Sequence, residues 1–136
     1  MPRMANGVVH IVAAVIEEDD KYLITQRRDE AVLPLLWEFP GGRPLAGETD
    51  EDALRREVSE RVGVDVVVHH KLTERTHPYD GYSVHLSLYS CHLSPGAVPR
   101  ICHVRDVRWV SSSEFGNYQF PPADQATMDQ LLGVRR

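Results

Sequence analysis

The chain has 136 residues, of which 42% are hydrophobic and 26% are charged, a composition that is ordinary for a soluble globular protein. Its length predicts a single domain over residues 1–136 with a substantial core. The net charge of −5 supplies no basic surface for a nucleic-acid polymer, although it does not exclude a single nucleotide as a ligand.

The first apolar run, Val8 to Ile16, is predicted to be a buried β-strand because it is rich in β-branched residues. It is too short to cross a membrane and no small-residue cleavage site follows it, so we expect no membrane partner. An acidic turn over Glu17 to Asp20 follows the run. Lys21 to Gln26 is then predicted to be a second strand, which forms a hairpin with the first.

The stretch Trp37 to Gly42 introduces the most informative part of the chain. Its two adjacent glycines predict a sharp turn at which the backbone can approach a ligand closely. A helix is predicted from Asp50 to Val62, with Thr49 as its N-cap and Gly63 as its end. Apolar residues recur on one face of this helix and predict its buried stripe, namely Leu54, Val58 and Val62.

Two carboxylates, Glu57 and Glu60, are spaced three residues apart and share the neighbouring face of that helix. Carboxylates beside a glycine turn can hold a hard cation through oxygen ligands. Such a cation could carry the phosphates of a nucleotide. The alternative is a solvated helix on which Glu57 and Arg61 form a surface ion pair, worth about 0.2–0.5 kcal/mol.

The spacing of this segment resembles the Nudix box, G-x5-E-x7-R-E-U-x-E-E-x-G-U, in which U is a bulky aliphatic residue. The matching positions are Gly42, Glu48, Arg56, Glu57, Val58, Glu60, Gly63 and Val64. One position departs from the pattern, because the second glutamate of the E-E pair is Arg61. A pattern matched at so many fixed positions is far more specific than a lone glycine motif.

The resemblance to the Nudix family covers the whole chain and implies an α/β fold, the Nudix α/β/α sandwich with a mixed β-sheet. It implies that Glu57 and Glu60 ligate Mg²⁺, or Mn²⁺, or orient the attacking water. Arg56 would hold a helix carboxylate in place and Glu48 would support the site from the loop. The carbonyl of Gly41 corresponds to a backbone metal ligand in relatives.

Substrate contacts are implied by a resemblance to the MutT-like branch of the family. Arg27 stands where an arginine of that branch reaches the substrate phosphates; the alternative is a solvated cation at the end of a strand. Glu38 and Phe39 lie in the segment that corresponds to L-E-F-P-G-G, where the ring of Phe39 can line a base pocket and also pack in the core. Asp124 follows Phe-Pro-Pro-Ala, where relatives have a base-contacting asparagine, and it could also cap a final helix over Gln125 to Leu132.

The segments after the central helix are predicted to be strands at Val64 to Thr73, Tyr82 to Leu93 and Val104 to Val110. The first two are separated by a predicted loop that ends in the hairpin signal Asp80-Gly81. His103 marks a second departure, because MutT-like relatives have a glutamate there. Imidazole binds transition metals well but suits magnesium poorly.

The function implied by the resemblance is metal-dependent hydrolysis of a nucleoside triphosphate to the monophosphate and pyrophosphate. An ionised Asp124 would only accept hydrogen bonds, so we expect a cytidine- or guanine-type base, including a modified or oxidised one, that presents N–H donors. The alternative is a Nudix-fold nucleotide-binding protein with weak or no hydrolase activity, because Arg61 and His103 replace carboxylates that surround the metal in relatives.

The expected partner is therefore a small-molecule nucleotide, and we expect the chain to act as a monomer or homodimer. Cys91 and Cys102 are the only cysteines, and they form neither a disulfide framework nor a metal-ligand spacing. Free thiols are typical of a reducing compartment, so we predict a cytoplasmic protein.

Overall fold

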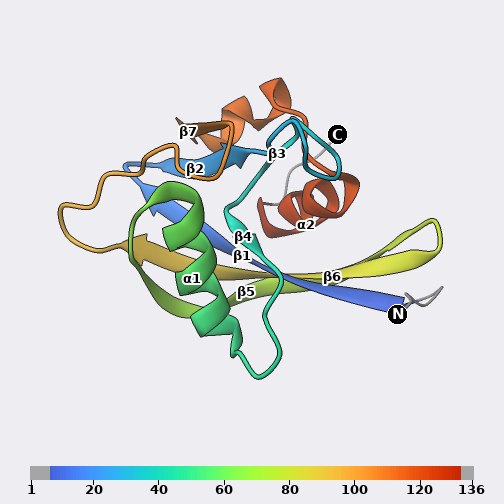
Figure 1. The fold of residues 1–136 in the computed structure, drawn as a ribbon. Helices are drawn as coiled ribbons and strands as arrows, with labels where there is room; N and C mark the ends of the chain where they lie inside the picture. The colour runs from blue at the N-terminus through green and yellow to red at the C-terminus, as the bar shows by residue number, and fades with distance from the viewer. Residues whose placement is uncertain (1–6, 133–136) are drawn as a thin grey trace.

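The computed structural model describes residues 7–132 of the chain (Figure 1). Its elements in chain order are β1 (Gly7–Glu18), β2 (Lys21–Gln26), β3 (Trp37–Glu38), β4 (Gly41–Gly42), α1 (Asp50–Val62), β5 (Val66–Tyr79), β6 (Tyr82–Leu93), β7 (Asp106–Val110), the 3-10 helix η1 (Ser112–Asn117) and α2 (Pro122–Leu132). Within the described residues, none of the helices has the length and apolar character needed to cross a membrane.

The sheet is mixed, as predicted, and its strand order is β3-β2-β1-β6-β5, with β4 paired to β1 and β7 paired to β2. β1 runs parallel to β6, whereas its pairings with β2 and β4 are antiparallel. The predicted hairpin between the first two strands is confirmed. Its turn residues Asp19 and Asp20 have φ angles of 52° and 63°, a left-handed conformation that aspartate tolerates better than most residues.

The predicted loop after Thr73 is wrong, because β5 continues to Tyr79 and pairs with β6 up to the Tyr79–Tyr82 pair. Only Asp80 and Gly81 form the turn, as the hairpin signal predicts, and Gly81 has a φ of 85°. The far half of β5 is mostly polar and exposed because β5 lies at the edge of the sheet. Register shifts between Val68 and Thr73 also break the alternation by which a strand is recognised.

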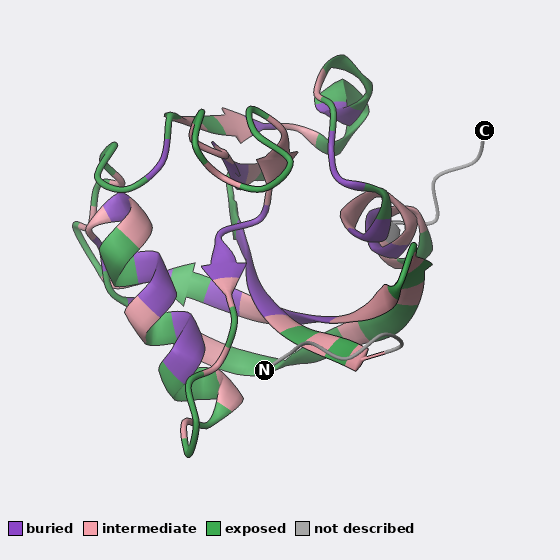
Figure 2. Ribbon diagram, turned by 45° about the vertical axis from the view of Figure 1, so that its right-hand side comes forward, coloured by how far each residue is buried: buried purple, intermediate pink, exposed green. Residues whose placement is uncertain are grey.

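Helices cover both faces of the sheet. Successive residues of β1 point to opposite faces, so this strand contributes side chains to the core on each side. One face packs on α1 through Val12, Ala14 and Ile16 of β1 with Leu54, Val58 and Val62 of α1. The other packs beneath α2 and a group of aromatic rings through Ala13 and Val15 of β1 with Phe39, Phe115, Phe120 and Met128. Buried positions accordingly run along β1 and recur along α1 (Figure 2). These two cores form the predicted α/β/α arrangement.

Helix α1 has the predicted bounds and ends. The Oγ1 atom of Thr49 accepts a hydrogen bond of 3.1 Å from the N–H of Asp52, which satisfies one of the free donors of the first turn. Gly63 has a φ of 69° and its N–H donates to the carbonyl of Ser59. The helix is therefore fixed at both ends by local interactions, and its orientation against β1 is set by the buried stripe.

Helix α2 begins at Pro122 rather than at the predicted Gln125. Proline is favourable at the first helical position, where its missing N–H costs nothing. Asp124 therefore lies inside the first turn of α2, and the interpretation of Asp124 as the N-cap is wrong. A carboxyl group in this first turn still lies near the positive end of the helix.

Candidate active site

A cavity of about 540 Å³ opens between β1, the glycine turn, α1, the β5–β6 hairpin and the start of α2. The predicted site residues that line it are Arg27, Glu38, Phe39, Gly41, Arg56, Glu57 and Asp124. Glu48 and Glu60 lie outside this lining, and each contacts it through Arg56. The fold thus brings together side chains that are almost a hundred residues apart in the chain.

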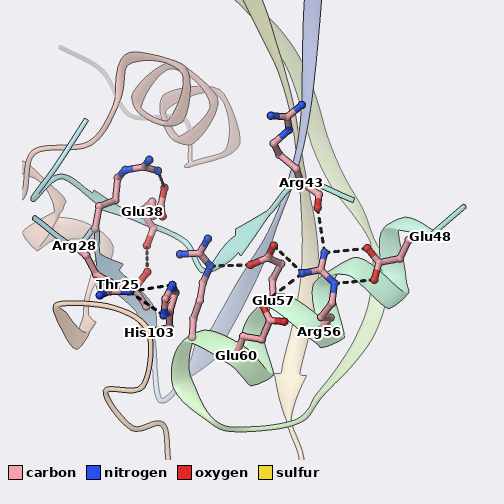
Figure 3. A network of polar contacts seen from close by, with 11 residues as sticks. Thr25, Arg28, Glu38, Arg43, Glu48, Arg56, Glu57, Glu60 and His103 are labelled. Atoms are coloured by element: carbon pink, nitrogen blue, oxygen red, sulfur yellow. Dashed lines mark hydrogen bonds and ion pairs between the residues drawn. The ribbon is translucent and has the colours of Figure 1, made fainter. Parts of the chain in front are cut away.

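The carboxylate of Glu57 lines the cavity and is only 12% exposed. It lies at the centre of a network of polar contacts (Figure 3). Its Oε2 atom lies 3.1 Å from Nη1 of Arg56, and its Oε1 atom lies 3.0 Å from Nε of Arg61. The Glu57–Arg61 pair predicted from the sequence is therefore real, but it lies in the cavity rather than on a solvated surface. Gly42 lies directly beside it, and a Cβ at this position would clash with Glu57 Oε2 and displace the carboxylate.

Arg56 ties the loop before α1 to the helix. Its Nε and Nη2 atoms donate to the two carboxylate oxygens of Glu48 at 2.9 and 3.0 Å, and Nη2 also donates to the carbonyl of Arg43 at 3.1 Å. The hydrogen bonds from Arg56, followed by that from the N–H of Leu45, lower the pKa of Glu48 to about 2. Bonding to Glu48 likewise raises the pKa of Arg56. This is the geometry that a positioning role for both residues requires.

Glu60 lies on the same side of α1 as Glu57, but it is more open to solvent. Its side chain is 57% exposed, and one oxygen lies 3.5 Å from Nη1 of Arg56. The two box glutamates thus differ in environment, since one is enclosed between cations and the other is accessible to water. The two glutamates can accordingly have different chemical roles at the same site.

Arg27 lines the cavity and is not the solvated strand-end cation of the alternative interpretation. Its side chain is 24% exposed, its Nη1 donates to Glu38 Oε1 at 3.0 Å, and its Nε donates to the carbonyl of Val32 at 2.6 Å. Burial raises the pKa of Glu38 even though Arg27 opposes the shift. The arginine is therefore held in a fixed orientation beside a carboxyl group.

Asp124, in the first turn of α2, also lines the cavity. Burial and the nearby carboxyl group of Glu38 raise its pKa well above the usual range. The surroundings thus favour the protonated form, which both donates and accepts hydrogen bonds, over the ionised form assumed from the sequence. In that form Asp124 resembles the asparagine of the MutT-like pattern.

Phe39 is only 2% exposed, and it both packs in the core and borders the cavity, as expected. Its ring centroid lies 6.1 Å from that of Phe115, at an interplanar angle of 80°. Such edge-to-face packing fixes the ring. The same ring then provides a rigid apolar surface at the cavity.

The sequence did not reveal the apolar wall that the β5–β6 hairpin adds to the cavity. Tyr79 and Tyr82 stack with ring centroids 5.2 Å apart, and Tyr79 also accepts a hydrogen bond of 3.0 Å from the N–H of Ala123. Both tyrosines line the cavity. Their positions on either side of the Asp80-Gly81 turn were a usable signal, since a tight hairpin places such residues opposite one another.

The comparison with family models decides the classification. A model of the NUDIX domain matches residues 11–130. The chain belongs to the Nudix family. This Nudix chain is 30% identical over 128 residues to the CTP pyrophosphohydrolase of Escherichia coli, with 94% of each chain covered. It is also 30% identical over 131 residues to the 8-oxo-dGTP diphosphatase of Haemophilus influenzae, with 95% of each chain covered.

A solved structure of a Nudix hydrolase, MutT from methicillin-resistant Staphylococcus aureus, is 35% identical to this Nudix chain. The match covers 94% of this chain and 98% of the other, with a TM-score of 0.70. The resemblance drawn from the box is thus confirmed for the family and for the α/β fold. The classification as a Nudix hydrolase is confirmed with it.

The Glu48–Arg56 contact predicts a measurable titration. The carboxyl ¹³C signal of Glu48 should titrate with a midpoint of about 2, and Arg56→Gln should move it towards the ordinary value of about 4.3. Because the pKa is lower in the folded state, the contact stabilises the fold above the unfolded pKa and this stabilisation is lost as the pH falls towards 2.

Glu74 is the control for this titration, because hydrogen bonds from His85 and Lys71, and not from Arg56, lower its pKa; Arg56→Gln should leave that shift unchanged. A wild-type Glu48 that already titrates near 4.3 would contradict the contact.

Proposed function

We propose that the protein hydrolyses a nucleoside triphosphate to the monophosphate and pyrophosphate, with Mg²⁺ or Mn²⁺ as the metal ion. The observation that carries this proposal is one cavity whose lining includes the box carboxylate Glu57 together with Phe39 and Asp124. Such a cavity can accept phosphates and a base at the same time. The relatives in E. coli and H. influenzae, whose names specify CTP and 8-oxo-dGTP, support a nucleotide of this class.

The carboxylates suit a metal ion that is shared with the substrate. Among residues 7–132, no three acidic, histidine or cysteine side chains converge tightly enough to hold an ion alone. Mg²⁺, however, is usually bound by one or two carboxylates together with substrate phosphates. Glu57, Glu60 and the Gly41 carbonyl fit that requirement. When bound, the ion would neutralise phosphate charge and orient the triphosphate group for in-line displacement.

The remaining chemistry belongs to the side chains. Glu60 is the water-accessible carboxylate, and it can orient the attacking water and accept its proton. Arg56, held by Glu48, fixes Glu57 in place. Arg27 reaches the cavity in a fixed orientation and can donate to phosphate oxygens as the charge is displaced onto pyrophosphate.

The hydrolysis itself is tested by a product screen over CTP, GTP, UTP, TTP and 8-oxo-dGTP, with Mg²⁺ and with Mn²⁺. We expect equal amounts of monophosphate and pyrophosphate from at least one nucleotide. Glu60→Gln should lower kcat by about 10²–10⁴-fold, as expected for loss of a positioned proton acceptor, with the fold intact.

The matched control is Glu51→Gln, since Glu51 is a similarly exposed glutamate of α1 whose side chain is 55% exposed. That variant should keep the wild-type rate. Full activity in Glu60→Gln would remove Glu60 from the site. A nucleoside diphosphate as the product would contradict the reaction.

The base preference is assigned to Asp124. Its carboxyl group can ionise when a base presents N–H donors to it, and those hydrogen bonds would replace the solvation that burial removes. Cytosine and guanine, including oxidised guanine, present such donors, whereas uracil and thymine present fewer. We therefore assign the site to cytidine- or guanine-type triphosphates.

We expect wild-type kcat/KM for CTP or a guanine nucleotide to exceed that for UTP and TTP by roughly tenfold or more, because a buried polar group without a partner is penalised. Asp124→Asn should change this ranking. The control is Asp52→Asn, an aspartate on α1 whose side chain is 64% exposed. Identical kcat/KM values for all bases in wild type and in Asp124→Asn would show that Asp124 plays no part in base choice.

A second candidate is a nucleotide-binding protein with weak hydrolysis, and one contact favours it. Arg61 occupies Oε1 of Glu57 at 3.0 Å, on an oxygen that a metal ion would otherwise use. The product screen separates the two candidates, since binding without pyrophosphate release would identify the second. A cytoplasmic location, a single domain over residues 1–136 and a monomeric or homodimeric state stay predictions.

A further inference from the structure

A second, smaller cavity of about 180 Å³ adjoins the main one, and Arg27 and Arg61 line both. Its remaining lining comes from Arg28, Glu30, Ala31 and His103. Glu30 is the one acidic side chain in this lining, and it pairs with Arg28 at 2.6 Å. The cavity is therefore dominated by nitrogen donors, and it opens beside the box carboxylate Glu57.

The two residues that depart from the Nudix pattern, Arg61 and His103, meet in this cavity. The backbone N–H of His103 donates to the carbonyl of Arg61 at 3.0 Å, so the end of α1 fixes the segment that precedes β7. Nη1 of Arg28, at the end of β2, lies 3.0 Å from Nδ1 and 3.1 Å from Nε2 of the His103 ring (Figure 3). Three separate segments thus deliver three basic side chains to one place.

The chemistry of these groups suits an anion rather than a metal ion. Each arginine presents a planar set of N–H donors that matches the oxygens of a phosphate group. Nη1 of Arg28 lies almost equally close to both ring nitrogens of His103. Because an arginine can only donate, it bonds to whichever ring nitrogen carries no proton, and the neutral ring keeps one N–H donor. Replacing a carboxylate by Arg61 also changes the local charge by two units, which weakens metal binding and strengthens phosphate binding.

We propose that a subsite formed by Arg28, Arg61 and His103 holds the terminal phosphates of the nucleotide, which are the part released as pyrophosphate. Two of these residues, Arg61 and His103, stand where the Nudix pattern has carboxylates. The subsite rests on the proposed function, because the nucleotide must lie in the main cavity for its phosphates to reach Arg61. Arg61 links the two cavities, since it lines both and its Nε donates to Glu57.

The test is isothermal titration of the full chain with inorganic pyrophosphate in EDTA, where no metal ion can mediate binding. Wild type should bind, and Arg61→Gln and Arg28→Gln should each weaken the Kd by about tenfold or more, as loss of a hydrogen bond to a charged group predicts. Arg55→Gln is the matched control: Arg55 lies on the same helix as Arg61, is 49% exposed and pairs with Asp52. It should leave the Kd unchanged.

Circular dichroism establishes that each variant is folded, and Arg28→Gln, on a different element, tests the subsite even if Arg61→Gln does not fold. Failure of wild type to bind pyrophosphate without metal, or an unchanged Kd in a folded Arg28→Gln or Arg61→Gln variant, would overturn the subsite. These results are independent of the proposed function. If the protein hydrolyses a nucleotide with metal but does not bind pyrophosphate without metal, the subsite alone is rejected. If it binds pyrophosphate without metal through Arg61 but hydrolyses no nucleotide, the proposed function alone is rejected.

Discussion

The ion pairs of Glu57 are the interaction around which the site is built. A carboxylate that is only 12% exposed is tolerated because one oxygen faces Arg56 and the other faces Arg61. Removing one partner of an enclosed ion pair costs about 3–5 kcal/mol, since the remaining charge is then poorly compensated. Gly42 leaves room for the carboxylate in this position, because a Cβ there would displace it. The position of the Glu57 carboxylate thus depends both on its two arginine partners and on the glycine turn.

The interactions around Glu57 extend in two directions. Arg56 carries them to Glu48 and the loop before α1, which fixes the polar end of the cavity. Arg61 carries them to the smaller cavity and to the segment of His103. The two arginines therefore differ in function, since Arg56 positions a carboxylate and Arg61 replaces acidic charge with basic charge. A Nudix site that gains cations in this way can share the neutralisation of a triphosphate between protein and metal.

How far the sequence predicted the structure depended on the range of the interactions involved. The bounds of α1 were predicted correctly because Thr49, Gly63 and the apolar stripe act within a few residues. The far half of β5 was missed because its strand conformation comes from pairing with β6 and not from its own polar sequence. The raised pKa of Asp124 depends on burial beside Glu38, and the meeting of Arg61 with His103 depends on a contact between distant segments. Neither can be inferred from local pattern.

The most direct test of the central claim is a crystal structure of the complex with Mn²⁺ and a non-hydrolysable nucleoside triphosphate, with the metal located by its anomalous scattering. We expect manganese to contact Glu57 or Glu60 and phosphate oxygens, the base to lie near Asp124, and the terminal phosphates to lie against Arg61. A nucleotide bound outside the main cavity, or manganese that contacts neither glutamate, would contradict it.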